Sequence, residues 1–179
     1  MLNNKAESRL LQLVDDPEAG RNSYWEKKLS SLSLDRIDQG RFSGGFLPEG
    51  HTSRGSLRNR LTHHVLLTPW RKMGAEFPSF DSYLGIARSA VERRGGRLDL
   101  CMMRQVLTLC LLTERLPLHR MLEPIVLIGD GWGSMASLVL ACFPQPKVVL
   151  INLTKPLLVD IVYTKKAHPG VNICLTETL

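Results

Sequence analysis

The chain has 179 residues, which is enough for one domain of ordinary size or two small ones. Hydrophobic residues make up 44% of it and charged residues 22%, a globular composition that excludes an intrinsically disordered chain. No apolar run approaches the ~20 residues that cross a bilayer, and the polar first residues do not predict a secretory signal. We therefore expect a cytoplasmic protein that does not bind membranes.

The net charge of +6 comes from the middle of the chain, where residues 51–104 hold ten Lys or Arg against four Asp or Glu. Nine of the ten are Arg, which suits planar, bidentate contact with anions. The segment could dock a phosphorylated or acidic partner in a non-catalytic interaction module, although a solvated helix surface is the simpler explanation. No nucleic-acid-binding motif accompanies the charge, so no nucleic-acid partner is expected. The basic residues are Arg54, Arg58, Arg60, Arg71, Lys72, Arg88, Arg93, Arg94, Arg97 and Arg104.

The first fifty residues show only weak signs of regular structure. Residues 5–14 and 22–32 are each compatible with a short amphipathic helix, and the first of these would end before Pro17. The glycine-rich stretch 39–50 predicts a loop.

A stronger helix is predicted after this loop. Ser79 or Asp81 can cap it, and the glycine pair 95–96 should end it after about Arg94. An apolar stripe of this kind usually faces a core. The predicted core face is Tyr83, Ile86, Ala87, Ala90 and Val91.

A second helix is predicted from Asp99, as its cap, to about Arg115. With the preceding segments it makes residues 1–118 a mainly helical N-terminal region. Its broad apolar face is Met102, Val106, Leu109, Cys110 and Leu112.

The four cysteines form no C-x-x-C pair, and all have apolar neighbours. This pattern predicts buried free thiols in a reducing compartment and no metal site. They are Cys101, Cys110, Cys142 and Cys174.

Residues 119–179 predict the first half of a Rossmann-like cofactor-binding domain. Apolar and β-branched runs alternate with helical patterns, and Thr154 can cap the second helix. The order β-α-β-α-β implies three parallel strands with right-handed crossovers, hence an α/β fold with an incomplete Rossmann-like sheet. The expected strands cover residues 125–128, 147–153 and 171–175, and the expected helices cover residues 134–143 and about 156–168.

The most informative segment is IVLIGDGWGSMASLVLAC, which starts at Ile125. It places Gly129, Gly131 and Gly133 between a strand and a helix. Glycine lets the backbone turn sharply and approach a ligand, and the helix N-terminus offers free N–H groups. In such folds a residue about 20 positions further on, at the end of the next strand, reaches the cofactor ribose. That position is Asn152 here.

Two patterns fit this loop. Gly131-x-Gly133-x-x-Ala136 matches a dinucleotide-binding pattern, whereas Gly129-x-Gly131-x-Gly133 uses all three glycines directly after the strand. The second pattern resembles the first motif of class I S-adenosylmethionine-dependent methyltransferases. The segments IVLIGDGWGSMASLVLACFP and KVVLINLTKPLLVDIVYTKK are similar to the sugar O-methyltransferase family over about residues 120–175.

This resemblance implies a methyltransferase that binds S-adenosyl-L-methionine and acts on a sugar hydroxyl of a small-molecule acceptor. It implies that the glycine loop lines the methionine and ribose end of the cofactor, and that Asn152 approaches the ribose hydroxyls. The expected cofactor-binding residues are Gly129, Asp130, Gly131, Trp132, Gly133, Asn152 and Leu153.

The chain departs from the family at two positions where an acid is usual. Leu127 stands just before the first glycine of the motif, and Asn152 ends the second strand. An amide gives a ribose hydroxyl no charge-assisted hydrogen bond. A neutral Asn152 near Lys155 would also suit a 2′-phosphate, so an NADP-dependent oxidoreductase stays an alternative, as does a purely structural glycine-rich turn.

Methyltransferases of this class have a seven-stranded sheet, by resemblance, with the first strand in the middle. Only three strands are expected here, so the strand at residues 125–128 should expose an open apolar edge. The chain could be a fragment whose activity requires a C-terminal half, could pair this edge in a homodimer, or could cover it with its N-terminal region. We expect the first outcome.

No pattern identifies a catalytic residue. A histidine suits general-base work near neutral pH, but none of the five is paired with a carboxylate at an informative spacing. They are His51, His63, His64, His119 and His168.

Overall fold

The computed structural model describes residues 33–36, 41–43 and 57–174, together with Gln12. Apart from Gln12, the short helices expected within residues 5–32 lie outside the described residues. Strands β1 (Ser33–Arg36) and β2 (Arg41–Ser43) pair antiparallel. The loop predicted over residues 39–50 therefore contains a strand, since pairing with β1 offers partners to its backbone polar groups.

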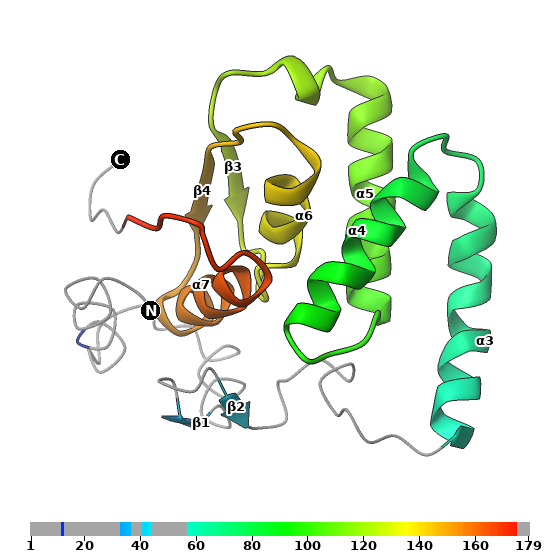
Figure 1. Cartoon of the computed structure of the whole chain (residues 1–179), viewed down its shortest axis with the longest axis horizontal. Helices are drawn as coiled ribbons and strands as arrows, with labels where there is room; N and C mark the ends of the chain where they lie inside the picture. The colour runs from blue at the N-terminus through cyan, green and yellow to red at the C-terminus, as the bar shows by residue number, and fades with distance from the viewer. Residues whose placement is uncertain (1–11, 13–32, 37–40, 44–56, 175–179) are drawn as a thin grey trace.

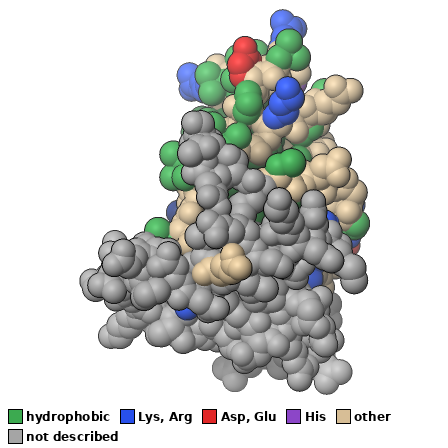
Figure 2. All heavy atoms as spheres, turned by 90° about the vertical axis from the view of Figure 1, so that its left-hand side faces the viewer, with side chains coloured by type: hydrophobic (Ala, Val, Ile, Leu, Met, Phe, Trp, Pro, Cys, Tyr) green, Lys and Arg blue, Asp and Glu red, His purple; other side chains and the backbone are tan. Residues whose placement is uncertain are grey.

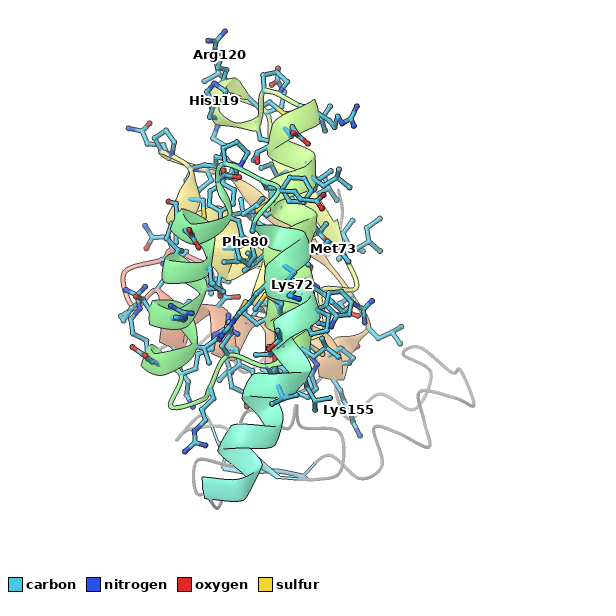
Figure 3. The ribbon with its side chains drawn as sticks, turned by 90° about the vertical axis from the view of Figure 1, so that its right-hand side faces the viewer. Lys72, Met73, Phe80, His119, Arg120 and Lys155 are labelled. Carbon is cyan, nitrogen blue, oxygen red and sulfur yellow. The ribbon has the colours of Figure 1, made fainter. Side chains whose placement is uncertain are left out.

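Three helices follow, α3 (Leu57–Gly74), α4 (Phe80–Arg93) and α5 (Leu100–Arg115). α3 packs on α5, while α4 and α5 pack on each other and on α6 (Figure 1). No separate helix is predicted from the sequence where α3 lies, and the structure shows one that contains Pro69, although an interior proline normally kinks or ends a helix. Figure 3 looks onto α3, where the side chains of Lys72 and Met73 are exposed.

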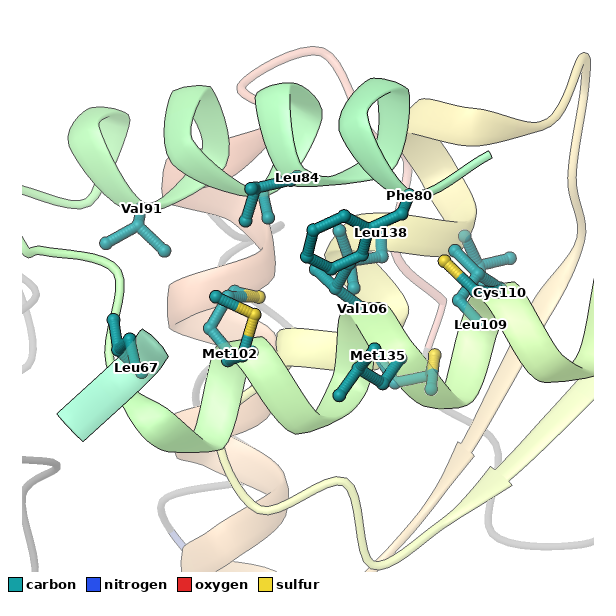
Figure 4. Close-up of a cluster of buried hydrophobic side chains, with 14 of the residues drawn as sticks. Leu67, Phe80, Leu84, Val91, Met102, Val106, Leu109, Cys110, Met135 and Leu138 are labelled. Atoms are coloured by element: carbon teal, nitrogen blue, oxygen red, sulfur yellow. The ribbon is translucent and has the colours of Figure 1, made fainter. Parts of the chain in front are cut away.

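The core lies between α4, α5 and α6 (Figure 4). α5 contributes Val106 and Leu109 as predicted, but Leu112 is 37% exposed. On α4 the buried residues are Phe80, Leu84, Ala87, Ala90 and Val91, whereas the predicted Tyr83 and Ile86 are only half-buried. Complete burial of one such side chain, for example Leu138 of α6, contributes about 1.5–3 kcal/mol.

The turn between α4 and α5 confirms two predicted helix ends. Gly95 has φ +77°, and the N–H of Gly96 donates to the carbonyl of Val91 at 3.0 Å, which closes the end of α4. The Oδ1 atom of Asp99 accepts a hydrogen bond from the N–H of Met102 at 2.7 Å, which caps α5. Arg94 is the C-cap residue of α4 and directly precedes Gly95.

The sheet consists of two parallel strands, β3 (Ile125–Ile128) and β4 (Val148–Ile151), paired in register from Ile125 with Val148 onward. α6 (Ser134–Cys142) connects them and lies between the sheet and the pair α4 and α5 (Figure 1). α7 (Thr154–Ala167) follows β4 and packs on α6. The described part of the chain is thus a mixed α/β structure with a small parallel sheet.

Two expectations for this region are wrong. Residues 171–174 form no strand, although their sequence is apolar enough for one. A strand needs a backbone partner, and sequence pattern alone cannot supply one. Thr154 does not cap α7: the cap position is Leu153, and Thr154 is the first helical residue.

The two faces of β3 differ. Ile125 and Leu127 pack against the core, while Val126 is 52% and Ile128 78% exposed. Apolar side chains on one face of β3 are thus exposed, while the open backbone edge expected for this strand, and a homodimer through it, stay predictions. Figure 2 shows further hydrophobic side chains beside charged ones at the end of the molecule that carries the short helix η3 (Leu118–Arg120). Leu116, Met121 and Leu122 are exposed in this part of the chain.

None of the four cysteines forms a disulfide bond. Cys110 is buried and Cys142 half-buried, but Cys101 and Cys174 are exposed, so the prediction of four buried thiols is wrong for these two. Cys101 is exposed because it lies about 100° around α5 from Met102, on the side away from the buried Met103. None of the described helices is long and apolar enough to cross a membrane.

Candidate cofactor-binding loop

The glycine loop joins β3 to α6 at the carboxyl end of the sheet. Its three glycines all have positive φ, +70° at Gly129, +79° at Gly131 and +58° at Gly133. Other residues rarely adopt this left-handed conformation, which explains why glycine alternates through the loop. The N–H of Gly129 donates to the carbonyl of Ile151 at 2.9 Å, so the loop starts directly from the paired strands.

The glycines face different surroundings. Gly133 is buried against α7, and a Cβ atom there would clash with the carbonyl oxygen of Asp160 and with Oγ1 of Thr164. A Cβ at Gly129 would meet nothing, and one at Gly131 only the carbonyl oxygen of Gly129, at 3.9 Å. Gly133 therefore permits close packing of α7, whereas Gly129 and Gly131 form the open side of the loop.

Asp130 closes the N-terminus of α6. Its Oδ1 accepts from the N–H of Met135 and its Oδ2 from the N–H of Ala136, both at 2.9 Å. Burial raises the pKa of Asp130, while these two hydrogen bonds and the charge of Arg94 act in the opposite direction. A carboxylate at this end of a helix typically stabilises it by about 0.3–1 kcal/mol, so Asp130 supports the loop from within.

Asn152 lies half-buried at the end of β4, and its amide points to α7. Its Nδ2 donates to Oδ2 of Asp160 at 2.8 Å, and its Oδ1 accepts from the N–H of Leu153 at 2.9 Å. These two bonds use one N–H and one lone pair of the amide. A second N–H and a second lone pair can still bond to a ligand.

Asp160 is a buried carboxylate that sequence reasoning missed. It is 0% exposed in α7, and its Oδ1 accepts from the N–H of Gly133 at 3.0 Å while Oδ2 accepts from Asn152. Desolvation raises its pKa to about 7, assisted by the charge of Asp130 and opposed by hydrogen bonds from Asn152, Gly133 and Gly131. One signal was present in the sequence: Asp160 is the single acid in the apolar run LLVDIVY.

Arg94 reaches the loop from the end of α4. It is only 8% exposed, and its guanidinium donates to the carbonyls of Trp132 and Gly133, at 3.3 and 2.7 Å, and to Oγ of Ser137. Burial lowers its pKa to about 10, so it stays charged at neutral pH. The sequence predicted Arg94 as part of a basic surface, and nothing there separates it from exposed Arg93.

An aromatic pair flanks the loop. Trp132 is half-buried and meets the buried ring of Tyr163 edge-on, with ring centroids 6.1 Å apart. The charges of Arg94 and Lys166 each lie 5.7 Å from the centroid of the Tyr163 ring. Burial raises the pKa of Tyr163 to about 12, so the ring is neutral and attracts both cations.

The described histidines do not supply a base at the loop. Nε2 of His168 is hydrogen-bonded to the carbonyl of Ser137 in α6 at 2.9 Å, and burial lowers the pKa of His168. His119 is exposed, and Figure 3 shows it at the opposite end of the described structure from Lys155, which lies in the first turn of α7. His51 and the side chains of His63 and His64 are outside the described part of the structure.

Comparisons with protein-family models, with curated proteins and with solved structures find no match to this chain. Among the described residues, no group of three or more His, Cys, Asp or Glu could hold a metal ion. The function must therefore be inferred from the chemistry of the glycine loop.

Proposed function

We propose that this chain is a cytoplasmic S-adenosyl-L-methionine-dependent methyltransferase whose cofactor lies over Gly129 and Gly131. The unit β3-α6-β4-α7 would then belong to a Rossmann-like domain. One observation carries the proposal: the loop is open at these two glycines, while Asp130 closes the N-terminus of the helix that follows.

The contacts of Asp130 favour one of the two cofactor classes that fit the sequence. A dinucleotide places its pyrophosphate on the free N–H groups at the start of the helix. Here the N–H groups of Met135 and Ala136 bind the Asp130 carboxylate, which would also repel a phosphate. S-adenosyl-L-methionine has no phosphate and carries a sulfonium cation, so it suits a loop that contains the carboxylate of Asp130.

The loop residues would have distinct roles. Gly129 and Gly131 would bring the backbone close to the methionine and ribose end of the cofactor, with Trp132 at its side. The free N–H and lone pair of Asn152 could bond a ribose hydroxyl, next to Leu153. Asp130 and Gly133 would act indirectly by fixing the loop, since Asp130 is hydrogen-bonded to α6 and Gly133 to α7.

The reaction would be an in-line displacement. When bound, the cofactor would supply its methyl group to the oxygen of a sugar hydroxyl and would leave as S-adenosylhomocysteine. The hydroxyl proton leaves to a base. Positioning of the two reactants would supply much of the rate. The choice of a sugar acceptor comes from the sequence resemblance.

Isothermal titration with S-adenosylhomocysteine tests the site. Gly131→Asn is the informative variant, because Asn tolerates positive φ better than other side chains and would fill the open side of the loop. Gly95→Asn is its control, with a similar φ of +77° and open space around it. We expect wild type and Gly95→Asn to bind and Gly131→Asn to bind much more weakly.

A folded wild-type protein that gives no heat at millimolar S-adenosylhomocysteine would contradict the proposal. Binding of NADPH instead would favour the oxidoreductase alternative.

A further inference from the structure

We infer that Arg94 is a positioning residue that holds the glycine loop in its ligand-binding shape, so that affinity at the loop is set from α4. The inference rests on the proposed function for the identity of the ligand. It adds a residue from outside the glycine motif to the machinery of the site.

Hydrogen bonds from two sides fix the peptide unit between Trp132 and Gly133 and the peptide unit that follows it. On one side the guanidinium of Arg94 donates to the carbonyls of Trp132 and Gly133. On the other side the N–H of Gly133 donates to Asp160. Each bond pairs a donor with an acceptor. Together the bonds stabilise the positive φ of Gly133.

Arg94 also connects the loop to the first turns of α6. Its Nη2 binds both the carbonyl of Gly133 and the hydroxyl of Ser137, and that hydroxyl donates to the same carbonyl at 2.6 Å. A planar guanidinium can serve several acceptors at once, whereas the ammonium of a lysine acts as a point charge. The arrangement therefore suits Arg better than Lys, since Nη1 and Nη2 reach separate acceptors.

Burial of a cation that serves only packing would be unfavourable, because charged groups lose their hydration. Arg94 is 8% exposed, and the charges of Asp130, Asp99 and Asp160 raise its pKa against the effect of burial. Its neighbour Arg93 is exposed at the surface. The contrast shows that the position at the end of α4, and not the general basicity of this segment, brings Arg94 to the loop.

The end of α4 determines where the guanidinium lies. Arg94 occupies the last position before Gly95, whose left-handed conformation ends the helix. A shift of α4 would therefore move the donors away from the loop carbonyls, which links the helical region to the cofactor loop.

The test compares Arg94→Ala and Arg94→Lys with the matched control Arg93→Ala. Two measurements are made on each full-length protein: affinity for S-adenosylhomocysteine by titration, and amide hydrogen exchange over residues 129–137. Loss of the guanidinium's hydrogen bonds should weaken binding by on the order of tenfold to a hundredfold in both Arg94 variants. Exchange should accelerate in this segment, while Arg93→Ala matches wild type in both measurements.

A guanidinium rescue distinguishes positioning from general stability. Millimolar guanidinium chloride should restore part of the affinity of Arg94→Ala, and sodium chloride of the same ionic strength should not. Arg94→Lys keeps the charge and serves in its place if Arg94→Ala does not fold. Unchanged affinity and unchanged exchange in a folded Arg94 variant would overturn the inference.

The ligand and the positioning role can fail separately. If wild type does not bind S-adenosylhomocysteine, the proposed function fails, and hydrogen exchange alone decides about Arg94. Faster exchange confined to residues 129–137 in the Arg94 variants would then support positioning, and wild-type exchange would overturn it.

Discussion

Asn152, at the end of β4, donates a hydrogen bond from Nδ2 to Oδ2 of Asp160 in α7, at 2.8 Å. The other oxygen of Asp160 accepts from the N–H of Gly133. One buried carboxylate thus connects the sheet, the last helix and the glycine loop. The amide predicted to approach a ribose is already part of this connection, so its substitution should affect the fold as well as any ligand.

Asn152→Leu should destabilise the protein by about 1–3 kcal/mol, because it keeps a similar volume but leaves one buried oxygen of Asp160 without its donor. Urea unfolding near pH 8, where Asp160 is mostly ionised, measures this loss. Asn172→Leu is the control, since Asn172 is exposed. Equal stability of the two variants would show that the hydrogen bond contributes nothing.

The stability should depend on pH through Asp160. Its pKa in the folded protein is about 7, above the value of about 3.9 expected in the unfolded chain. The folded state therefore holds a proton that the unfolded state has lost between these values. The contribution of Asp160 to the free energy of unfolding should fall by about 1.4 kcal/mol for each pH unit in this window, and stay constant above about pH 7.

A comparison of wild type with Asp160→Asn isolates this contribution. His168 acts in the opposite sense, because burial lowers its pKa and makes stability rise with pH up to its unfolded value, but it is present in both proteins. Urea titrations from about pH 5 to pH 8 give the free energy of unfolding of both proteins. The value for wild type minus that for Asp160→Asn should fall up to about pH 7 and stay constant above it. A difference independent of pH would mean that Asp160 stays ionised throughout.

Asp130→Ala should cost about 0.5–2 kcal/mol, since it removes the carboxylate that binds two N–H groups of α6. It should also free that helix end for a phosphate. We therefore expect phosphate, compared with chloride at equal ionic strength, to raise the melting temperature of Asp130→Ala but not of wild type. Asp81→Ala, in the exposed first turn of α4, provides the control. A phosphate effect of the same size in wild type would argue that Asp130 does not block the site.

Gly133→Ala should destabilise the protein by at least about 2 kcal/mol, because the added methyl group meets the backbone of α7 at a positive φ. Gly85→Ala should instead stabilise it by about 0.5–1 kcal/mol, since Gly85 lies in α4 with nothing near a new Cβ. Thermal unfolding of both variants provides the measurement. Similar effects of the two changes would contradict the close packing of α7 on the loop.

Local sequence patterns are sufficient to predict several of the helices and strands. The strand Ile125–Ile128, the cap at Asp99 and the stop at Gly95 appear where the patterns predict them, because spacing of apolar residues, caps and glycine conformation act over a few residues. The alternate glycines likewise predicted a turn between strand and helix, and their positive φ values explain the pattern.

The contacts of the glycine loop, in contrast, follow from tertiary packing. Arg94 reaches it across 38 to 43 positions of sequence, and Asp160 across 27. Such contacts depend on how helices pack, and nothing local distinguishes Arg94 from Arg93. The same reason explains the missing strand at residues 171–174: the apolar pattern is present, but a strand forms only where packing brings a backbone partner beside it.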